Sequence, residues 1–153
     1  METREEFSHW EIDTVVGLKA SQDNVLLTLI ERKTRFEIIQ KIDGENATAV
    51  TAGITQLRKQ CDFFFSDIFK TITSDNGVEF ADFSSCLNGV TEVFFTHPYS
   101  FWERGTNERH HGMIRRFISK GTEMRTVSRL HIKRVENWMS QLPRKILGYQ
   151  TSR

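Results

Sequence analysis

The stretch Ile72-Thr73-Ser74-Asp75-Asn76-Gly77-Val78-Glu79-Phe80 predicts a buried strand that ends at an acidic residue. The β-branched residues at its start favour a pleated, half-buried surface. Asp75-Asn76-Gly77 then breaks the strand, because Asn and Gly tolerate turn geometry. A carboxylate at the carboxyl end of a strand lies where open α/β sheets bind ligands. Taken alone, Asp75 is more simply interpreted as a solvated turn residue, so the other acids of the chain decide its role.

The composition is that of an ordinary globular protein. The chain has 153 residues, of which 38% are hydrophobic and 27% charged, and this length suits one domain with one core. No apolar run approaches the ~20 residues that a membrane span needs. The acidic start, residues 1–6, has no apolar stretch behind it and does not resemble a secretory signal. Cys61 and Cys86 lack a CxxC spacing, so we interpret them as reduced structural thiols of a cytosolic protein.

The net charge of +1 hides an asymmetry along the chain. Residues 1–100 carry 9 Lys and Arg against 16 Asp and Glu, whereas residues 101–153 carry 12 against 4. An acidic half followed by a basic half suggests that one part holds a cation and another a polyanion. Solvated helices carry such runs about as often, so charge alone leaves both interpretations open.

The first strand, residues 9–16, contains an acid that a buried strand does not need. Alternation puts Asp13 on one face with Glu11 and Val15, while the apolar residues Trp10 and Ile12 take the other. A carboxylate in such a strand is costly to bury unless it is paired or binds a metal. Asp13 is therefore a candidate site residue, and Glu11 is an alternative to it on the same face.

The order of the remaining elements indicates an α/β fold. Short loops join the first strand to strands over 25–30 and 35–42, which predicts an antiparallel meander. Asp43 or Asn46 caps a helix over 47–61. The aromatic link 62–69 is expected in the core, with an exposed partner surface as the alternative. The later elements are a strand over 70–73, a helix over 78–87, a strand over 91–95, and helices over 105–118 and 128–142. In the helix over 78–87, the side chains of Phe80, Phe83 and Leu87 are expected to face the core.

The helix that starts near Gly105 carries an acid in its first turn. Glu108, His111 and Arg115 share one face of this helix. The helix dipole already favours a carboxylate at this end, so a merely stabilising role is the simpler interpretation of Glu108. The pair His110-His111 suggests zinc, but no second ligand cluster stands at a metal-binding spacing, and we reject that site.

Four segments, in this order, resemble the catalytic core of bacterial insertion-sequence transposases. The resemblance is to the group named for insertion sequence thirty, within the retroviral-integrase-like superfamily, and it covers nearly the whole chain. The segments are His9-Trp10-Glu11-Ile12-Asp13, Thr71-Ile72-Thr73-Ser74-Asp75-Asn76-Gly77-Val78-Glu79-Phe80, Tyr99-Ser100-Phe101-Trp102-Glu103-Arg104-Gly105-Thr106-Asn107-Glu108 and Pro143-Arg144-Lys145-Ile146-Leu147-Gly148-Tyr149.

The resemblance implies an α/β, RNase H-like fold over a single domain, residues 1–153. Its five-stranded mixed sheet has three antiparallel strands followed by two parallel ones, flanked by helices. Family members also carry an N-terminal helix-turn-helix region that has no counterpart in this sequence, so we expect a catalytic core fragment or a truncated relative. The expected location is the bacterial cytoplasm, in association with the nucleoid.

The resemblance further implies a DDE active site in which Asp13, Asp75 and Glu108 are both catalytic residues and metal ligands. The expected cofactor is Mg²⁺ or Mn²⁺, with two ions about 3.5–4 Å apart in the active complex. Without metal, three crowded carboxylates should raise the pKa of at least one of them. Three further residues are expected to orient these ligands without binding the metal themselves: Asn76, Asn107 and His111.

Two positions depart from the family pattern. Ile12 precedes the first aspartate where relatives often have Gly, and Phe101 stands where they usually have Pro. We expect the first to affect packing only and the second to leave the loop before Glu108 less rigid.

The implied activity is metal-dependent cleavage and strand transfer of DNA during transposition, by a homo-oligomer that is expected to be a dimer. Contacts to the DNA backbone fix register without reading sequence, and the candidates for them are Arg104, Arg109, Arg115, Arg116, Lys120 and Arg125. Two alternatives remain open. One is an RNase H-like nuclease that only hydrolyses, and the other is a noncatalytic DNA-binding or assembly module, against which the intact triad argues.

Overall fold

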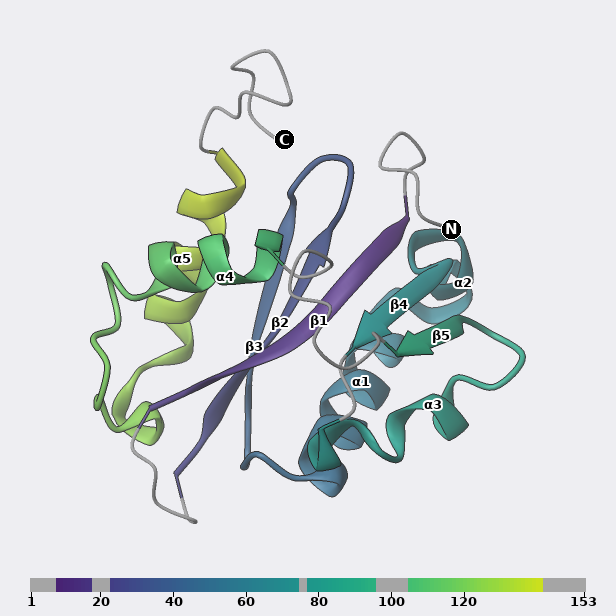
Figure 1. Ribbon diagram of the computed structural model, residues 1–153, viewed down its shortest axis with the longest axis horizontal. Coiled ribbons are helices and arrows are strands. Elements are labelled where there is room, and N and C mark those ends of the chain that lie inside the picture. The colour runs from purple at the N-terminus through teal and green to yellow at the C-terminus, as the bar shows by residue number, and fades with distance from the viewer. Residues whose placement is uncertain (1–7, 18–22, 75–76, 96–104, 142–153) are drawn as a thin grey trace.

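The computed structural model describes residues 8–17, 23–74, 77–95 and 105–141, with side chains from His110 onward in the last range. Within these ranges five strands form one sheet in the order β3-β2-β1-β4-β5 (Figure 1). They are β1 (His9–Val16), β2 (Val25–Glu31), β3 (Glu37–Ile42), β4 (Thr71–Ser74) and β5 (Glu92–Phe95). The first three pair antiparallel, and β4 runs parallel to both β1 and β5. The predicted α/β fold with a mixed sheet is confirmed.

The central strand β1 separates two layers of side chains. Trp10 and Ile12 join the core that packs against α1 (Ala47–Cys61). Val15 joins a second core on the opposite face, together with residues of α5 (Arg129–Gln141). Figure 1 shows α1 on one side of the sheet and α4 and α5 on the other. Since side chains alternate along a strand, Asp13 faces the α4 and α5 layer, on the side away from Trp10 and Ile12 that the sequence predicts.

Helix α1 begins where the sequence provides a cap. The side chain of Asn46 accepts a hydrogen bond of 2.9 Å from the backbone N–H of Ala49, which identifies Asn46 rather than Asp43 as the cap. The helix lies close to the sheet at Gly53, where an added Cβ would meet Ile42 Cγ2 at 2.9 Å. The absence of a side chain at Gly53 allows this close approach, and Val50, Ile54 and Leu57 of the same helix are buried in the core.

The aromatic link after α1 is only half buried. Phe65, at the start of α2 (Phe65–Ile68), and Phe69 are fully buried, and their rings stack at 4.7 Å. Phe63 and Phe64 are 75% and 57% exposed. The expectation that this link is core was therefore wrong for these two residues, because the chain turns through a 3-10 helix over 62–64 that points them outward.

The prediction of one continuous helix over 78–87 is wrong, but the prediction of its core residues is confirmed. A 3-10 turn over Val78–Phe80 is followed by the short helix α3 (Phe83–Cys86). Ser85 Oγ donates to the carbonyl oxygen of Asp82, a local bond that competes with continuous helix. Phe80, Phe83 and Leu87 are still fully buried.

On the opposite face, α4 (Gly105–Ile114) and α5 cover the antiparallel strands. Ser128 Oγ accepts a hydrogen bond from His131 N at 3.0 Å and so caps α5. Ile132, Val135 and Met139 form its buried stripe. Within the described part of the chain, no helix has the length and apolarity that crossing a membrane requires.

Candidate active site

Asp13 is a half-buried acid in the middle of the central strand. Its side chain is 23% exposed. One carboxylate oxygen, Oδ1, accepts a hydrogen bond of 2.8 Å from the backbone N–H of Thr14. Thr28 on β2 donates to the backbone carbonyl of Asp13 at 3.3 Å. These contacts hold the strand while leaving the carboxylate partly open to solvent.

His111 brings helix α4 to Asp13. Its Nε2 atom lies 3.7 Å from Asp13 Oδ2, and its side chain is 24% exposed. Glu108 precedes His111 by three residues, and residues three apart in a helix share a face. Positions 108 and 111 therefore belong to the same face of α4. The predicted supporting residue His111 therefore lies beside the first predicted ligand.

Several predicted site residues lie outside what the structure describes. Asp75 and Asn76 follow the last residue of β4 and fall in a gap, as does Arg104. The backbone of α4 includes Asn107, Glu108 and Arg109, whose side chains are not described. Among the side chains that are described, no three of His, Cys, Asp or Glu gather in a group that could hold a metal.

Glu11, the alternative to Asp13, has a different role. Its Oε2 lies 2.9 Å from Arg32 Nε, and the two side chains are only 2% and 9% exposed. A buried carboxylate paired with a guanidinium is a structural ion pair that joins β1 to the end of β2. The structure therefore separates the two acids that sequence alternation could not.

A buried pair between α4 and β3 was missed by the sequence analysis. His110 Nδ1 lies 2.7 Å from Glu37 Oε1, and the two side chains are 4% and 0% exposed. Glu37 stands in an apolar, alternating strand just as Asp13 does, so the same cost-of-burial argument could have identified it. Its partner could not be found in this way, because the two residues are 73 apart in the sequence.

The predicted DNA-contact residues that are described differ in their surroundings. Arg116, Lys120 and Arg125 are exposed. Arg125 Nε also lies 2.5 Å from Glu123 Oε2. Arg115 is half-buried and donates from a terminal nitrogen to the carbonyl oxygen of Val16 at 2.6 Å, and burial lowers the pKa of its guanidinium. Arg115 thus anchors the end of α4 to the end of β1.

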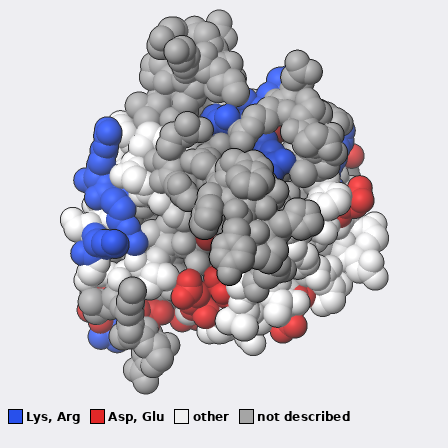
Figure 2. Space-filling model, in the orientation of Figure 1, with Lys and Arg blue, Asp and Glu red and all other residues white. Residues whose placement is uncertain are grey.

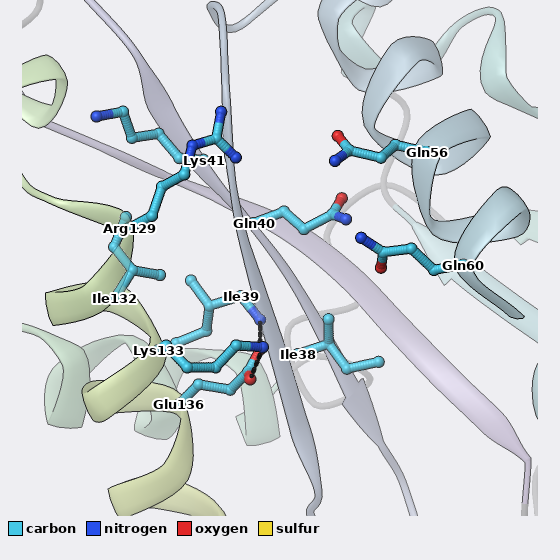
Figure 3. A pocket seen from close by; sticks show the side chains of 10 residues that line it. All are labelled: Ile38, Ile39, Gln40, Lys41, Gln56, Gln60, Arg129, Ile132, Lys133 and Glu136. Carbon is cyan, nitrogen blue, oxygen red and sulfur yellow. Dashed lines mark hydrogen bonds and ion pairs between the residues drawn. The ribbon is translucent and has the colours of Figure 1, made fainter.

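One group of cationic side chains lies on the side of the molecule that bears α4 and α5. Figure 2 shows Lys and Arg on its left, where Figure 1 places α4 and α5. A groove of about 210 Å³ runs along the edge strand β3, between α1 and α5. It is lined by Ile38, Ile39, Gln40, Lys41, Gln56, Gln60, Arg129, Ile132, Lys133 and Glu136 (Figure 3).

Two cations of this groove already have structural partners. Lys41 Nζ donates to the carbonyl oxygens of Arg125 and Val127 at 3.1 and 2.9 Å. Lys133 Nζ lies 2.9 Å from Glu136 Oε1. Glu136 Oε2 in turn accepts a hydrogen bond of 2.7 Å from Ile39 N, as Figure 3 shows. These contacts attach the edge strand β3 to α5 and to the segment 125–127 before it, and they do not point to a ligand.

Comparison with known proteins relates the chain to one class of protein. It is 35% identical over 98% of its length to a probable transposase for the insertion-like sequence element IS1161 of Streptococcus salivarius, and the match covers 42% of that protein. It is 37% identical over 99% of its length to the transposase for IS4351 of Bacteroides fragilis, covering 45% of it. No family model matches.

The fold and these relatives together define the class: an α/β chain of RNase H-like architecture, related to transposases. More particularly, the chain is a homologue of part of the insertion-sequence transposases, and the InsI transposase of IS30A from Escherichia coli K12 is among its relatives, at 32% identity over 99% of the chain. The chain spans less than half the length of these curated relatives, since the matches cover 38% to 45% of them.

Proposed function

We propose that this chain carries the catalytic core of a DNA transposase, which cleaves DNA and transfers strands by metal-dependent phosphoryl transfer. The observation that carries the proposal is the approach of His111 to Asp13 at 3.7 Å. It brings the helix that contains Glu108 over the strand that contains Asp13. The names of the relatives, all transposases of insertion elements, agree with this activity.

The pairing of β1 with β4 supports a role for Asp75. His9 pairs with Thr71, Trp10 with Ile72 and Glu11 with Thr73, so that partners are 62 residues apart. Asp13 and Asp75 have the same separation. This shared separation of 62 residues supports the proposal that Asp13 and Asp75 act together with Glu108.

The proposed donor set suits a hard divalent cation. Three carboxylates offer oxygen ligands, which Mg²⁺ and Mn²⁺ prefer. A pair of such ions would activate the attacking oxygen and stabilise charge on the leaving oxygen. Within the chain, Thr14 N–H orients Asp13 through Oδ1, and His111 lies beside Oδ2. Asn76 and Asn107 are proposed to support the other two acids.

DNA is the proposed partner, held by its phosphates. Arg116, Lys120 and Arg125 present exposed cations on the α4 and α5 side of the sheet, and Arg104 and Arg109 are proposed to extend this row toward Glu108. Arg115 is proposed to contribute charge while its bond to Val16 holds the helix. Backbone contacts of this kind would position DNA of any sequence. We further propose that the chain acts as a dimer.

The first test is Mn²⁺-dependent cutting of supercoiled DNA by the wild-type chain and by Asp13→Asn and Asp75→Asn. We expect both variants to lose at least 1,000-fold in rate, on the order of the loss for catalytic groups that act as a unit, while Glu92→Gln on β5 keeps full activity. Equal cutting by wild type and by the two aspartate variants would remove the acids from the proposed site.

A second assay separates strand transfer from hydrolysis. Oligonucleotides that end in a 3′-hydroxyl are incubated with target DNA, and joined products are scored on a sequencing gel. Joining supports a transposase, whereas cutting without joining supports the hydrolytic nuclease. If no DNA is cut, calorimetric titration of Mn²⁺ into wild type and Asp13→Asn tests the metal site directly, and DNA binding that is unchanged by Mn²⁺ would favour a noncatalytic module.

A further inference from the structure

We infer that the buried Glu37–His110 pair positions the metal-binding end of α4, and that Glu37 and His110 are positioning residues for Glu108. This inference rests on the function proposed above. In the proposed complex, these two buried side chains contact neither DNA nor metal. They nevertheless control the geometry of a site on the neighbouring strands.

The two halves of α4 are held in different ways. Its last residue, Ile114, is fully buried in the core with Met124, Ile132 and Met139. The first seven residues, Gly-Thr-Asn-Glu-Arg-His-His, contain no apolar side chain. The half of the helix that carries Glu108 therefore has no hydrophobic stripe of its own with which to pack against the sheet.

The described contacts between this polar part of α4 and the sheet are made by its two histidines. His110 reaches Glu37 on β3 at 2.7 Å, with both side chains at most 4% exposed. His111 reaches Asp13 on β1 at 3.7 Å and is about one-quarter exposed. The shorter and more deeply buried contact is the stronger restraint, because a hydrogen bond in a dry interior fixes direction as well as distance.

The registers show that the two contacts span the sheet. Asp13 pairs with Thr28 on β2, and Glu37 pairs with Ile30 on the same strand. Two adjacent residues of α4 thus contact strands that lie on either side of β2. Fixing both contacts sets the rotation of the helix about its own axis, and with it the orientation of the helix face to which positions 108 and 111 both belong.

The test measures metal affinity and not activity alone. Mn²⁺ is titrated calorimetrically into wild type, Glu37→Leu, Glu37→Gln and the paired variant Glu37→Leu/His110→Leu. Groups that orient metal ligands typically contribute about 10–100-fold to affinity. We expect Glu37→Leu and the paired variant to lose affinity in this range. Glu37→Gln should stay within about threefold of wild type, because its amide oxygen still accepts a hydrogen bond from His110.

Glu136→Leu is the matched control. Glu136 is also a buried carboxylate on the α5 side that bonds to β3, two residues along from Glu37, through Ile39 N at 2.7 Å. Helix α5 keeps its apolar stripe without this bond. We expect Glu136→Leu to lower the melting temperature as Glu37→Leu does and to leave Mn²⁺ affinity unchanged. Equal losses of affinity in the two variants would overturn the inference, since general destabilisation would then explain both.

The remaining outcomes separate this inference from the proposed function. If Asp13→Asn binds Mn²⁺ as tightly as wild type does, the proposed metal site fails and the inference fails with it. If Asp13→Asn abolishes binding while Glu37→Leu and the paired variant bind like wild type, the metal site stands and the positioning role is wrong. The paired variant removes both partners at once, so it keeps the test available where a lone buried histidine prevents folding.

Discussion

The Nε2 atom of His111 lies 3.7 Å from Oδ2 of Asp13, so helix α4 and the central strand meet at a carboxylate. Neighbouring residues on the two elements form stronger bonds, His110 to Glu37 and Thr14 to Asp13. The first of these bonds restrains helix α4 and the second restrains the carboxylate of Asp13, so both partners of the His111–Asp13 contact are fixed. Because His111 is partly exposed, it can be replaced without opening the core.

Replacing His111 with alanine should reduce Mn²⁺-dependent DNA cutting by about 10–100-fold, the usual effect of removing a group that orients a metal ligand. The melting temperature should change little, because the side chain is one-quarter exposed. His131→Ala on α5 is the control, since His131 is a half-buried histidine of the other helix. Equal rates for His111→Ala and wild type would show that His111 does not assist Asp13.

Replacing Glu31 with alanine should lower the free energy of unfolding by about 3 kcal/mol, because it leaves one buried and three partly buried donors without their acceptor. Glu31 is fully buried. Its Oε1 accepts hydrogen bonds from Lys33 N, Thr34 N and Thr34 Oγ1 at 3.0, 2.6 and 2.8 Å, and its Oε2 accepts one from Ser8 N at 3.1 Å. One carboxylate thus holds both the β2–β3 turn and the start of β1.

Urea denaturation followed by tryptophan fluorescence measures this loss. Glu92→Ala, at an exposed position of β5, should remain within about 0.5 kcal/mol of wild type. A Glu31→Ala variant as stable as Glu92→Ala would mean that the turn donors find water instead.

Two glycines should respond to alanine in opposite directions. At Gly112 in α4, an added Cβ would meet nothing within 4 Å, so Gly112→Ala should stabilise the chain by about 0.8–1 kcal/mol through helix propensity. At Gly17, an added Cβ would clash with the backbone oxygen of Thr122, so Gly17→Ala should destabilise the chain by about 1–3 kcal/mol. Thermal melts of both variants check the signs, and a shift in the same direction would contradict this packing.

The two thiols should react slowly in the folded chain. Burial raises the pKa of Cys61, and it raises the pKa of Cys86 more than Thr55 and Arg58 lower it. Less thiolate is therefore present in the folded than in the unfolded chain near pH 9. The stabilisation linked to these protonated thiols is complete below the pKa of the unfolded thiol and is lost as the pH rises through the folded pKa.

Iodoacetamide labelling read by mass spectrometry between pH 7 and 10 measures this difference. The pH midpoint of the labelling rate should lie higher in the folded chain than in 8 M urea, because the thiolate is the reactive form. Coincident midpoints would show that the thiols are effectively solvated.

Local patterns in the sequence predicted much of the fold. Alternation in residues 9–16 gave the strand β1 and put Asp13 on the face away from Trp10. The cap at Asn46 follows from side-chain chemistry within one turn. Phe80, Phe83 and Leu87 are buried whether residues 78–87 form one helix or two short turns, because both conformations bring them to the same side. Signals of this kind depend on a few neighbouring residues. They predict burial correctly even where the type or bounds of the helix or strand are predicted wrongly.

Features that depend on distant partners could not be predicted in this way. Alternation treats Glu11 and Asp13 alike, and only Arg32, 21 residues beyond Glu11, separates a structural acid from a candidate ligand. Arg115 resembles its exposed neighbour Arg116 in sequence but bonds to Val16, 99 residues away. Phe63 and Phe64 are of a residue type that is usually buried, but the turn after α1 exposes them. Tertiary contacts therefore decided these roles.

The position of β1 has a consequence for how the chain folds. On one side β1 pairs with β2 over a short loop, with Val16 opposite Val25, and on the other it pairs with β4 across 62 residues. Closing the longer loop costs more chain entropy and depends on contacts of greater sequence separation. The three-stranded meander should therefore form early and β4 should dock late. The strand that carries Asp13 would be in place before β4, which precedes Asp75 in the sequence, so the proposed catalytic site would be among the last parts of the molecule to assemble.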